Sequence, residues 1–300
     1  MATESPLCLV TPRDRDLFQA LDRCPLTVRQ LLKVSSTFAY AFTTERRVQE
    51  RLQCLAAAGR VRRWRYATAG QGALSYYTLT PLGYRLLHGV DTLPSGRGLF
   101  GPVGVARQAH TQALAEAIVH LVAAAHRTQI PIRNFRRENA LRLRVGDDSL
   151  YPDGAFELCP DQDARFTFYL EIDNRTETVA VGSSLDSWGR KVQFYEKYQD
   201  AQADRFRVLA ITTGGPERLR HMLEVAHDLA RNRRRSLVYG IGYTDLLHAE
   251  DPFTSACFRN HAHQSVALVT PFPRVREVFR LTGEPMMVAS APCLRPLPAV

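Results

Sequence analysis

The chain has 300 residues, of which 45% are hydrophobic, enough for two domains with apolar cores, and this composition excludes a disordered, collagen-like or coiled-coil protein. The formal net charge of +9 is unevenly spread. Residues 1–105 hold 14 Lys and Arg against 7 Asp and Glu, whereas residues 106–300 hold 25 against 23. A basic N-terminal third suits the phosphate backbone of a nucleic acid, although a solvated basic surface has the same composition.

The first hundred residues carry the periodicities of a small helical domain with a hairpin. Apolar residues at helical spacing, with Thr or Gly at the ends, predict three helices. Two β-prone arms around a turn at Gly70–Gly72 predict a hairpin, and a short helix follows. These elements are expected at residues 13–23, 26–33, 44–58, 60–80 and 81–89. Their order predicts a winged helix-turn-helix over residues 1–88.

Basic and amide side chains lie on the outer face of the third predicted helix and on the first hairpin arm. Side chains of these types contact phosphates and base edges in protein–DNA complexes. We expect duplex DNA to contact Arg46, Arg47, Gln49, Gln53, Arg62, Arg63 and Arg65. Winged helices also serve as protein-docking modules, so a protein-binding role is the alternative.

Residues 89–105 are rich in Gly and Pro and have no periodicity, which predicts a linker to a second domain of residues 106–300. In that domain, apolar periodicity predicts a helix, three strands, a helix, a strand, a helix and a strand. These are expected at residues 106–127, 141–145, 150–158, 166–173, 185–199, 205–213, 217 onward and 236–243. The αβββαβ order is that of the restriction-endonuclease-like fold, so the predicted fold class is α/β, or α+β for the whole chain.

Acidic residues occur where this fold places its chemistry. Asp153 begins the second predicted strand of this domain, and Glu171 and Asp173 lie two residues apart, on one face, at the end of the third. Carboxylates gathered at a sheet edge form a hard-oxygen site that suits Mg²⁺ or Mn²⁺. Such an ion lowers the pKa of a bound water and offsets charge on a phosphate. We therefore expect these three residues to bind the metal.

A cation is still needed beside the phosphate, and the usual Glu-x-Lys pattern has Asp173 in its last position. The nearest candidate is Lys191 on the next predicted helix, where Trp188, Lys191 and Tyr195 share one face. We expect Lys191 to be aimed at the carboxylates, with Tyr195 and Trp188 in support. The structural alternative is a turn at Asp153, a solvated pair of carboxylates and a surface lysine.

The segments YPDGAFEL, FTFYLEIDNRTE and WxxKVxxYxxY together resemble the replication-relaxation family of bacterial mobile elements, over residues 14–245. That family joins a winged helix to a PD-(D/E)XK-like domain and is related to plasmid mobilisation relaxases. The resemblance implies that Asp153, Glu171 and Asp173 occupy the acidic motif positions, and Lys191 and Tyr195 the helix motif. It further implies metal-dependent nicking of plasmid or integrative-element DNA when replication or transfer begins.

The partner that the resemblance implies is double-stranded DNA, and relaxosome or replication proteins and a second copy of the chain are further candidates. The alternative function is a catalytically inactive DNA-binding regulator or relaxosome accessory protein that keeps the nuclease fold. His261 and His263 form a His-x-His pair like that of rolling-circle nucleases, but no tyrosine follows Tyr243, so two polar loop histidines are the simpler interpretation. Two arginine groups, residues 133–144 and 231–235, could extend a DNA-binding surface or be solvated.

The chain contains six scattered cysteines without a CxxC pair: Cys8, Cys24, Cys54, Cys159, Cys257 and Cys293. This scatter predicts small buried thiols in a reducing compartment and neither a zinc site nor a disulfide framework. The chain does not begin like a signal peptide, and no apolar run is long enough to span a bilayer. We therefore expect a cytoplasmic protein with no membrane partner.

Overall fold

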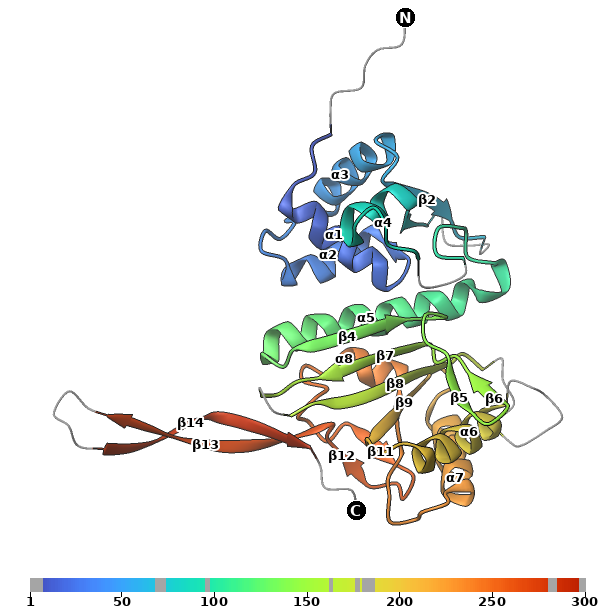
Figure 1. The fold of residues 1–300 in the computed structure, drawn as a ribbon, viewed down its shortest axis with the longest axis vertical. Helices are drawn as coiled ribbons and strands as arrows, with labels where there is room; N and C mark the ends of the chain where they lie inside the picture. The colour runs from blue at the N-terminus through green and yellow to red at the C-terminus, as the bar shows by residue number, and fades with distance from the viewer. Residues whose placement is uncertain are drawn as a thin grey trace, which may run out of the picture.

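The computed structural model describes residues 8–67, 74–94, 98–161, 164–175, 179, 187–279 and 285–296, with side chains described up to residue 269. Figure 1 shows an N-terminal helical region stacked on a larger α/β region, from which a long hairpin extends. The fold is mixed α/β, as the sequence predicted.

The N-terminal region contains the predicted elements in the predicted order. They are α1 (Pro12–Arg23), α2 (Val28–Val34), α3 (Glu45–Ala57), β2 (Val61–Arg65), β3 (Ser75–Leu79) and α4 (Pro81–His88), with a 3-10 turn at Ser35–Thr37. An additional short strand, β1 (Leu26–Thr27), pairs with β3 and completes an antiparallel sheet in the order β1-β3-β2. The predicted turn at Gly70–Gly72 lies outside the described residues.

A threonine hydroxyl caps each α-helix of this region by accepting a hydrogen bond from a backbone N–H of the first turn. The four caps are Thr11, Thr27, Thr44 and Thr80. Close packing also fixes α4 against the residue before β2. A Cβ atom at Gly83 would lie only 2.1 Å from the carbonyl oxygen of Arg60, so this position requires glycine.

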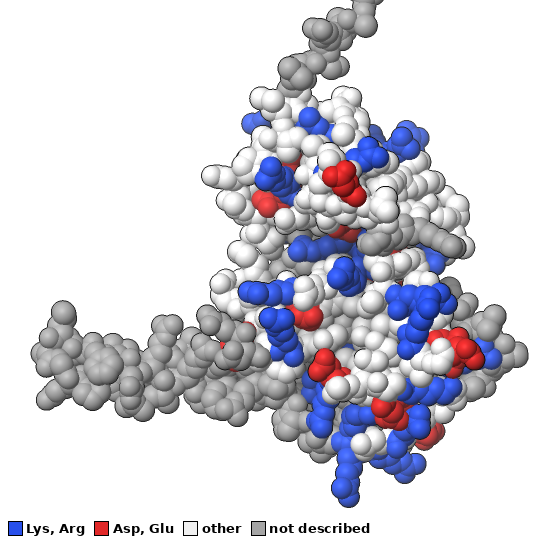
Figure 2. Space-filling model, viewed as in Figure 1, with Lys and Arg blue, Asp and Glu red and all other residues white. Residues whose placement is uncertain are grey.

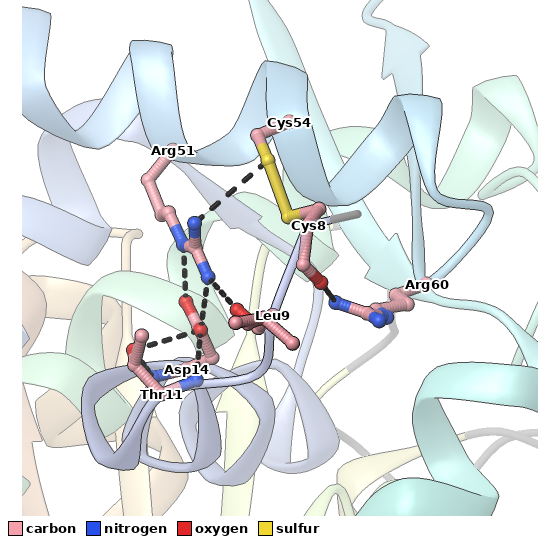
Figure 3. Close-up of polar contacts among 7 residues, drawn as sticks. All are labelled: Cys8, Leu9, Thr11, Asp14, Arg51, Cys54 and Arg60. Atoms are coloured by element: carbon pink, nitrogen blue, oxygen red, sulfur yellow. Dashed lines mark hydrogen bonds and ion pairs between the residues drawn. A yellow bond between two sulfur atoms is a disulfide. The ribbon is translucent and has the colours of Figure 1, made fainter. Parts of the chain in front are cut away.

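The segment before α1 is fastened to α3 by a disulfide and by polar contacts (Figure 3). Cys8 and Cys54 form the disulfide. Arg51 of α3 pairs with the buried Asp14 of α1, with 2.6 Å between Nε and Oδ1. The prediction of reduced cysteines was wrong for this pair, because a separation of 46 residues leaves no spacing motif in the sequence. Three other cysteines are free: Cys24, Cys159 and Cys257. The side chain of Cys293 lies outside the described residues.

The second region is built on a seven-stranded mixed sheet in the order β12-β11-β10-β9-β8-β7-β4. Its strands are β4 (Ile132–Arg137), β7 (Gly154–Leu158), β8 (Phe166–Asp173), β9 (Phe206–Thr212), β10 (Val238–Gly242), β11 (Phe258–Asn260) and β12 (Ser265–Val266). Its helices are α5 (Gln108–Thr128), α6 (Trp188–Ala201), α7 (Pro216–Leu229) and α8 (Tyr243–His248). Strands β8, β9 and β10 are parallel, and the other neighbours in this sheet are antiparallel.

The first strand of the sheet is not the one that the sequence predicted. Residues 141–145 were expected to form it, but β5 (Leu143–Val145) pairs only with β6 (Asp148–Leu150) in a separate hairpin against α6. The strand next to β7 is β4, with the sequence IRNFRR. Because an edge strand with three arginines has no clear apolar alternation, the sequence pattern did not reveal it. The hairpin that extends from the sheet region consists of β13 (Val269–Phe279) and β14 (Pro285–Pro296).

Each face of the sheet has its own core. Helices α5 and α8 cover one face, and α6 and α7 cover the other. The core under α5 continues into α1 and α2, and it includes Leu99 from the predicted linker, so the N-terminal region packs directly on α5. Polar contacts join the same elements, since Gln30 and Lys33 each lie 3.1 Å from the carboxylate of Glu116. Among the described helices, none is both long and apolar enough to cross a membrane.

Candidate metal centre and nucleic-acid surface

The carboxylate of Asp153 lies at the end of the sheet, directly before β7. Its Oδ2 atom accepts a hydrogen bond from the backbone N–H of Ile172 in β8, at 2.8 Å. Its Oδ1 atom lies 3.1 Å from Nε2 of His110 on α5. Burial alone would raise the pKa of Asp153, but the hydrogen bond and charge of His110 lower it below the usual value. Asp153 is therefore a buried, ionised carboxylate between β8 and α5.

Glu171 is buried one residue before Ile172, and its side chain meets α6. Lys191 Nζ lies 2.9 Å from Oε2, and the hydroxyl of Tyr195 donates to Oε1 at 2.6 Å. Burial raises the pKa of Glu171 to about 7, and the charge of Asp153 adds to this effect while Lys191 opposes it. The two carboxylates are thus electrostatically coupled and lie beside one cation.

The position of Lys191 is fixed by the packing of α6. Ser187 caps this helix, and the indole N–H of Trp188 donates to the carbonyl of Met222 in α7 at 2.9 Å. Tyr195 stacks on Tyr169 of β8, with 5.7 Å between the ring centroids. Lys191 therefore contacts Glu171, and Trp188 and Tyr195 fix the helix that positions it; the catalytic roles predicted for these residues stay predictions.

Asp173 lies on the same strand face as Glu171 but has different partners. Arg218 of α7 donates to both of its carboxylate oxygens, at 2.5 Å from Nε and 2.6 Å from Nη2. The hydroxyl of Thr212 donates to the same carboxylate at 2.6 Å. This pairing with Arg218 favours a structural role for Asp173, and its role as a metal ligand stays a prediction. Arg218 was missed because it follows Asp173 by 45 residues, on a different element.

Two further residues of this centre were not anticipated. His110 extends from the first turn of α5, and Glu138 directly follows β4. His110 Nε2 lies 3.8 Å from Glu138 Oε1, and Arg107 also pairs with Glu138. Burial would lower the pKa of His110, but Asp153 raises it, whereas burial and the charge of Asp153 raise the pKa of Glu138. No sequence motif marks His110 or Glu138, because only the fold brings α5 and β4 to Asp153.

The donor atoms of this centre fit a divalent cation. Glu171 and Asp153 supply carboxylate oxygens, the ligands that Mg²⁺ and Mn²⁺ favour. One ligand atom from each of His110, Glu138 and Asp153 lies within 4.8 Å of the others. A carboxylate oxygen that already accepts one hydrogen bond keeps a second lone pair, so the observed contacts leave capacity for a metal.

The side chains expected to contact DNA are all exposed: Arg46, Arg47, Gln49, Gln53, Arg62, Arg63 and Arg65. They extend from α3 and β2. Exposed ion pairs link Glu50 to Arg46 and to Arg47, and these weak contacts can open when a phosphate binds.

A second basic surface is formed by arginines in β4 and in or beside β5. Figure 2 shows Lys and Arg side chains spread over this face of the sheet region as well as over the N-terminal region. The exposed arginines of this surface are Arg133, Arg136, Arg142 and Arg144. Arg136 pairs in register with Ala155, two residues after Asp153, so this arginine lies on the strand next to that carboxylate.

Two other sequence motifs, the basic run of residues 231–235 and the His-x-His pair, lie in the described part of this region. Arg235 pairs with the buried Glu196 and with Asp200, and Arg231 also pairs with Asp200, so part of the basic run holds the segment after α7 to α6. The two histidines of the His-x-His pair differ in burial, since His261 is buried and His263 is exposed.

The sequence model of the replication-relaxation family matches residues 22–208, well over half of the chain. No curated protein and no solved structure matches the chain. The matched span contains Asp153, Glu171 and Lys191, together with His110 and Glu138, whereas Arg218 lies beyond it. The chain therefore belongs to the replication-relaxation family.

Proposed function

We propose that this protein nicks the DNA of a plasmid or integrative element by divalent-metal-dependent hydrolysis of a phosphodiester, as a step in replication or transfer. The family supports a role in replication and relaxation. The proposed chemistry rests on one observation: three charged side chains from three different elements lie close together. Lys191 from α6 lies 2.9 Å from Glu171 of β8, beside Asp153 at the start of β7.

Each residue of the centre has a separate role in this proposal. Asp153 and Glu171 hold Mg²⁺ or Mn²⁺, which lowers the pKa of a bound water and offsets charge on the phosphate when it is bound. Lys191 supplies a fixed ammonium for the negative charge that gathers in the transition state. Tyr195 orients Glu171 by its hydrogen bond of 2.6 Å. The buried position of both carboxylates strengthens these interactions, because few waters screen them.

Duplex DNA is the proposed partner of the exposed α3 and β2 side chains. The order of α1 to α4 and the β2–β3 hairpin between α3 and α4 are those expected of a winged helix. In such domains the third helix enters the major groove and the hairpin contacts the DNA backbone. The arginines of β4 and β5 then continue the positive surface toward Asp153. Binding by the first region would thus place a phosphodiester near the carboxylates of the second.

A catalytically inactive DNA-binding protein is the second candidate function. This function is favoured by the contacts of Glu171, because Lys191 and Tyr195 already bind one carboxylate oxygen each. Asp173, in the usual position of the motif lysine, is also bound by Arg218. In this alternative the same contacts stabilise the fold, and the sheet region serves as a platform for other proteins.

Supercoiled plasmid DNA that carries the element's own replication and transfer region separates the two functions. We expect the protein to convert it to open circles with Mg²⁺ or Mn²⁺ and not with EDTA. Asp153→Ala and Glu171→Ala should each abolish conversion and leave DNA binding largely intact, because these groups hold the metal and not the DNA. Tight binding without nicking, in all metals and topologies tried, would favour the inactive protein.

A further inference from the structure

The carboxylate of Asp153 has ligand-type neighbours on two sides. Glu171 and Lys191 lie on the side of α6, and they account for the proposed hydrolysis. On the side of α5 lie His110 and Glu138, which that chemistry does not use. His110 Nε2 is 3.1 Å from Asp153 Oδ1 and 3.8 Å from Glu138 Oε1.

The fold brings these three side chains together from separate elements. His110 lies in the first turn of the 21-residue helix α5, Glu138 follows the edge strand β4, and Asp153 precedes β7. All three are shielded from solvent, since the side chains of His110 and Glu138 are each 19% exposed and that of Asp153 is 9% exposed. One ligand atom of each lies within 4.8 Å of the other two.

We propose that His110, Glu138 and Asp153 bind a divalent transition-metal ion, with Mn²⁺ held more tightly than Mg²⁺. Two carboxylate oxygens alone would suit either ion, but an imidazole nitrogen is a ligand that transition metals accept readily and Mg²⁺ does not. Without metal, the contact between His110 Nε2 and Asp153 Oδ1 holds these two side chains together, and Arg107 pairs with Glu138. A bound ion would take the place of the proton between Nε2 and Oδ1, because the metal ligand is the neutral imidazole. Asp153 is then shared between this ion and the proposed site of Glu171.

This inference deepens the proposed function by naming the residues that decide metal preference, and it rests on that function only for its biological use. Metal binding can be measured on the whole protein without DNA. The signal of free Mn²⁺ in electron paramagnetic resonance falls as the ion binds, so a titration gives the dissociation constant, and competition with Mg²⁺ gives the preference.

We expect His110→Ala and Glu138→Gln each to weaken Mn²⁺ binding by about tenfold or more. The preference for Mn²⁺ over Mg²⁺ should fall mainly in His110→Ala, because that variant loses the nitrogen ligand. His126 is an exposed histidine near the other end of α5. His126→Ala is therefore the matched control and should bind Mn²⁺ like the unaltered protein. Circular dichroism would verify that each variant keeps its fold, and Glu138→Gln preserves side-chain size.

Unchanged Mn²⁺ affinity in both His110→Ala and Glu138→Gln would overturn the inference. So would a preference for Mn²⁺ that disappears only in Glu171→Gln, because the ion would then lie on the other side of Asp153. These outcomes are distinct from failure of the proposed hydrolysis. A protein that binds Mn²⁺ through His110 but never nicks DNA would contradict the proposed function and support this metal site.

Discussion

The charged side chains on α3 and β2 and those around Asp153 differ in their exposure to solvent. On α3 and β2 the basic side chains lie in solvent, and exposed ion pairs join Arg46 and Arg47 to Glu50. Around Asp153 the charged groups are buried and paired, and Glu171 is only 2% exposed. Exposed charges attract a polyanion over a distance, whereas buried ones act on a group placed beside them. Under the proposed function, DNA binding and the chemical step would therefore belong to two different surfaces.

The buried region itself contains an instructive pair. Glu171 and Asp173 lie two residues apart on one strand face, but the first faces Lys191 and the second is held by Arg218. Their spacing in the sequence predicted the same role, metal binding, for both. The partner that each meets, which only the packing of α6 and α7 determines, separates a candidate ligand from a structural ion pair.

The largest expected effect is that of Lys191→Ala on the chemical step. Loss of the ammonium should slow single-turnover nicking by about two orders of magnitude or more, with DNA affinity unchanged. Lys197→Ala is the matched control, because this lysine lies on the same helix but pairs with the exposed Asp148. Equal rates for the two variants would contradict the role of Lys191.

Asp173→Asn should affect stability and not the metal. It removes the charge that Arg218 and Thr212 contact, so we expect the free energy of unfolding in urea to fall by about 2 kcal/mol. Glu217→Gln, which weakens an exposed pair with Arg220, should change it by less than about 0.5 kcal/mol. A loss of Mn²⁺ affinity without a loss of stability would return Asp173 to the metal site.

The combined change Arg62→Ala and Arg63→Ala tests the exposed region. It should weaken duplex binding about equally for all sequences, and lower the slope of log affinity against log salt by about 2. Gln49→Ala should instead alter sequence preference, because an amide can contact base edges. Anisotropy titrations that find no change in the arginine variant would remove β2 from the DNA-binding surface.

A smaller effect should come from His120, which is buried in α5 with Nε2 2.9 Å from the carbonyl oxygen of Ala249. Burial and the charge of Lys33 lower its pKa below the usual 6.5. As the pH falls, His120 therefore takes up a proton in the unfolded chain before it does so in the folded chain. The free energy of unfolding consequently decreases as the pH falls below about 6.5. Urea unfolding at about pH 7.5 and about pH 5.5 should show a larger decrease for the unaltered protein than for His120→Gln. Equal decreases would show that His120 does not contribute.

The sequence was most informative where local pattern and tertiary structure agree. The alternation of FTFYLEID predicted β8 with its observed bounds, and the threonines expected at helix ends include the observed caps Thr27 and Thr44. The strand β4 was missed because its arginines conceal the alternation. His110, Arg218 and the disulfide between Cys8 and Cys54 were missed because each depends on contacts between residues far apart in the chain.

The central claim is that Asp153 holds a divalent metal beside Glu171. Diffraction from crystals of the protein soaked in Mn²⁺, measured at the manganese absorption edge, locates the ion directly. We predict an anomalous peak within bonding distance of the Asp153 carboxylate and on the side of the sheet end where Glu171 and Lys191 meet. Absence of a peak there at saturating Mn²⁺, or a peak bound only at other residues, would contradict the account.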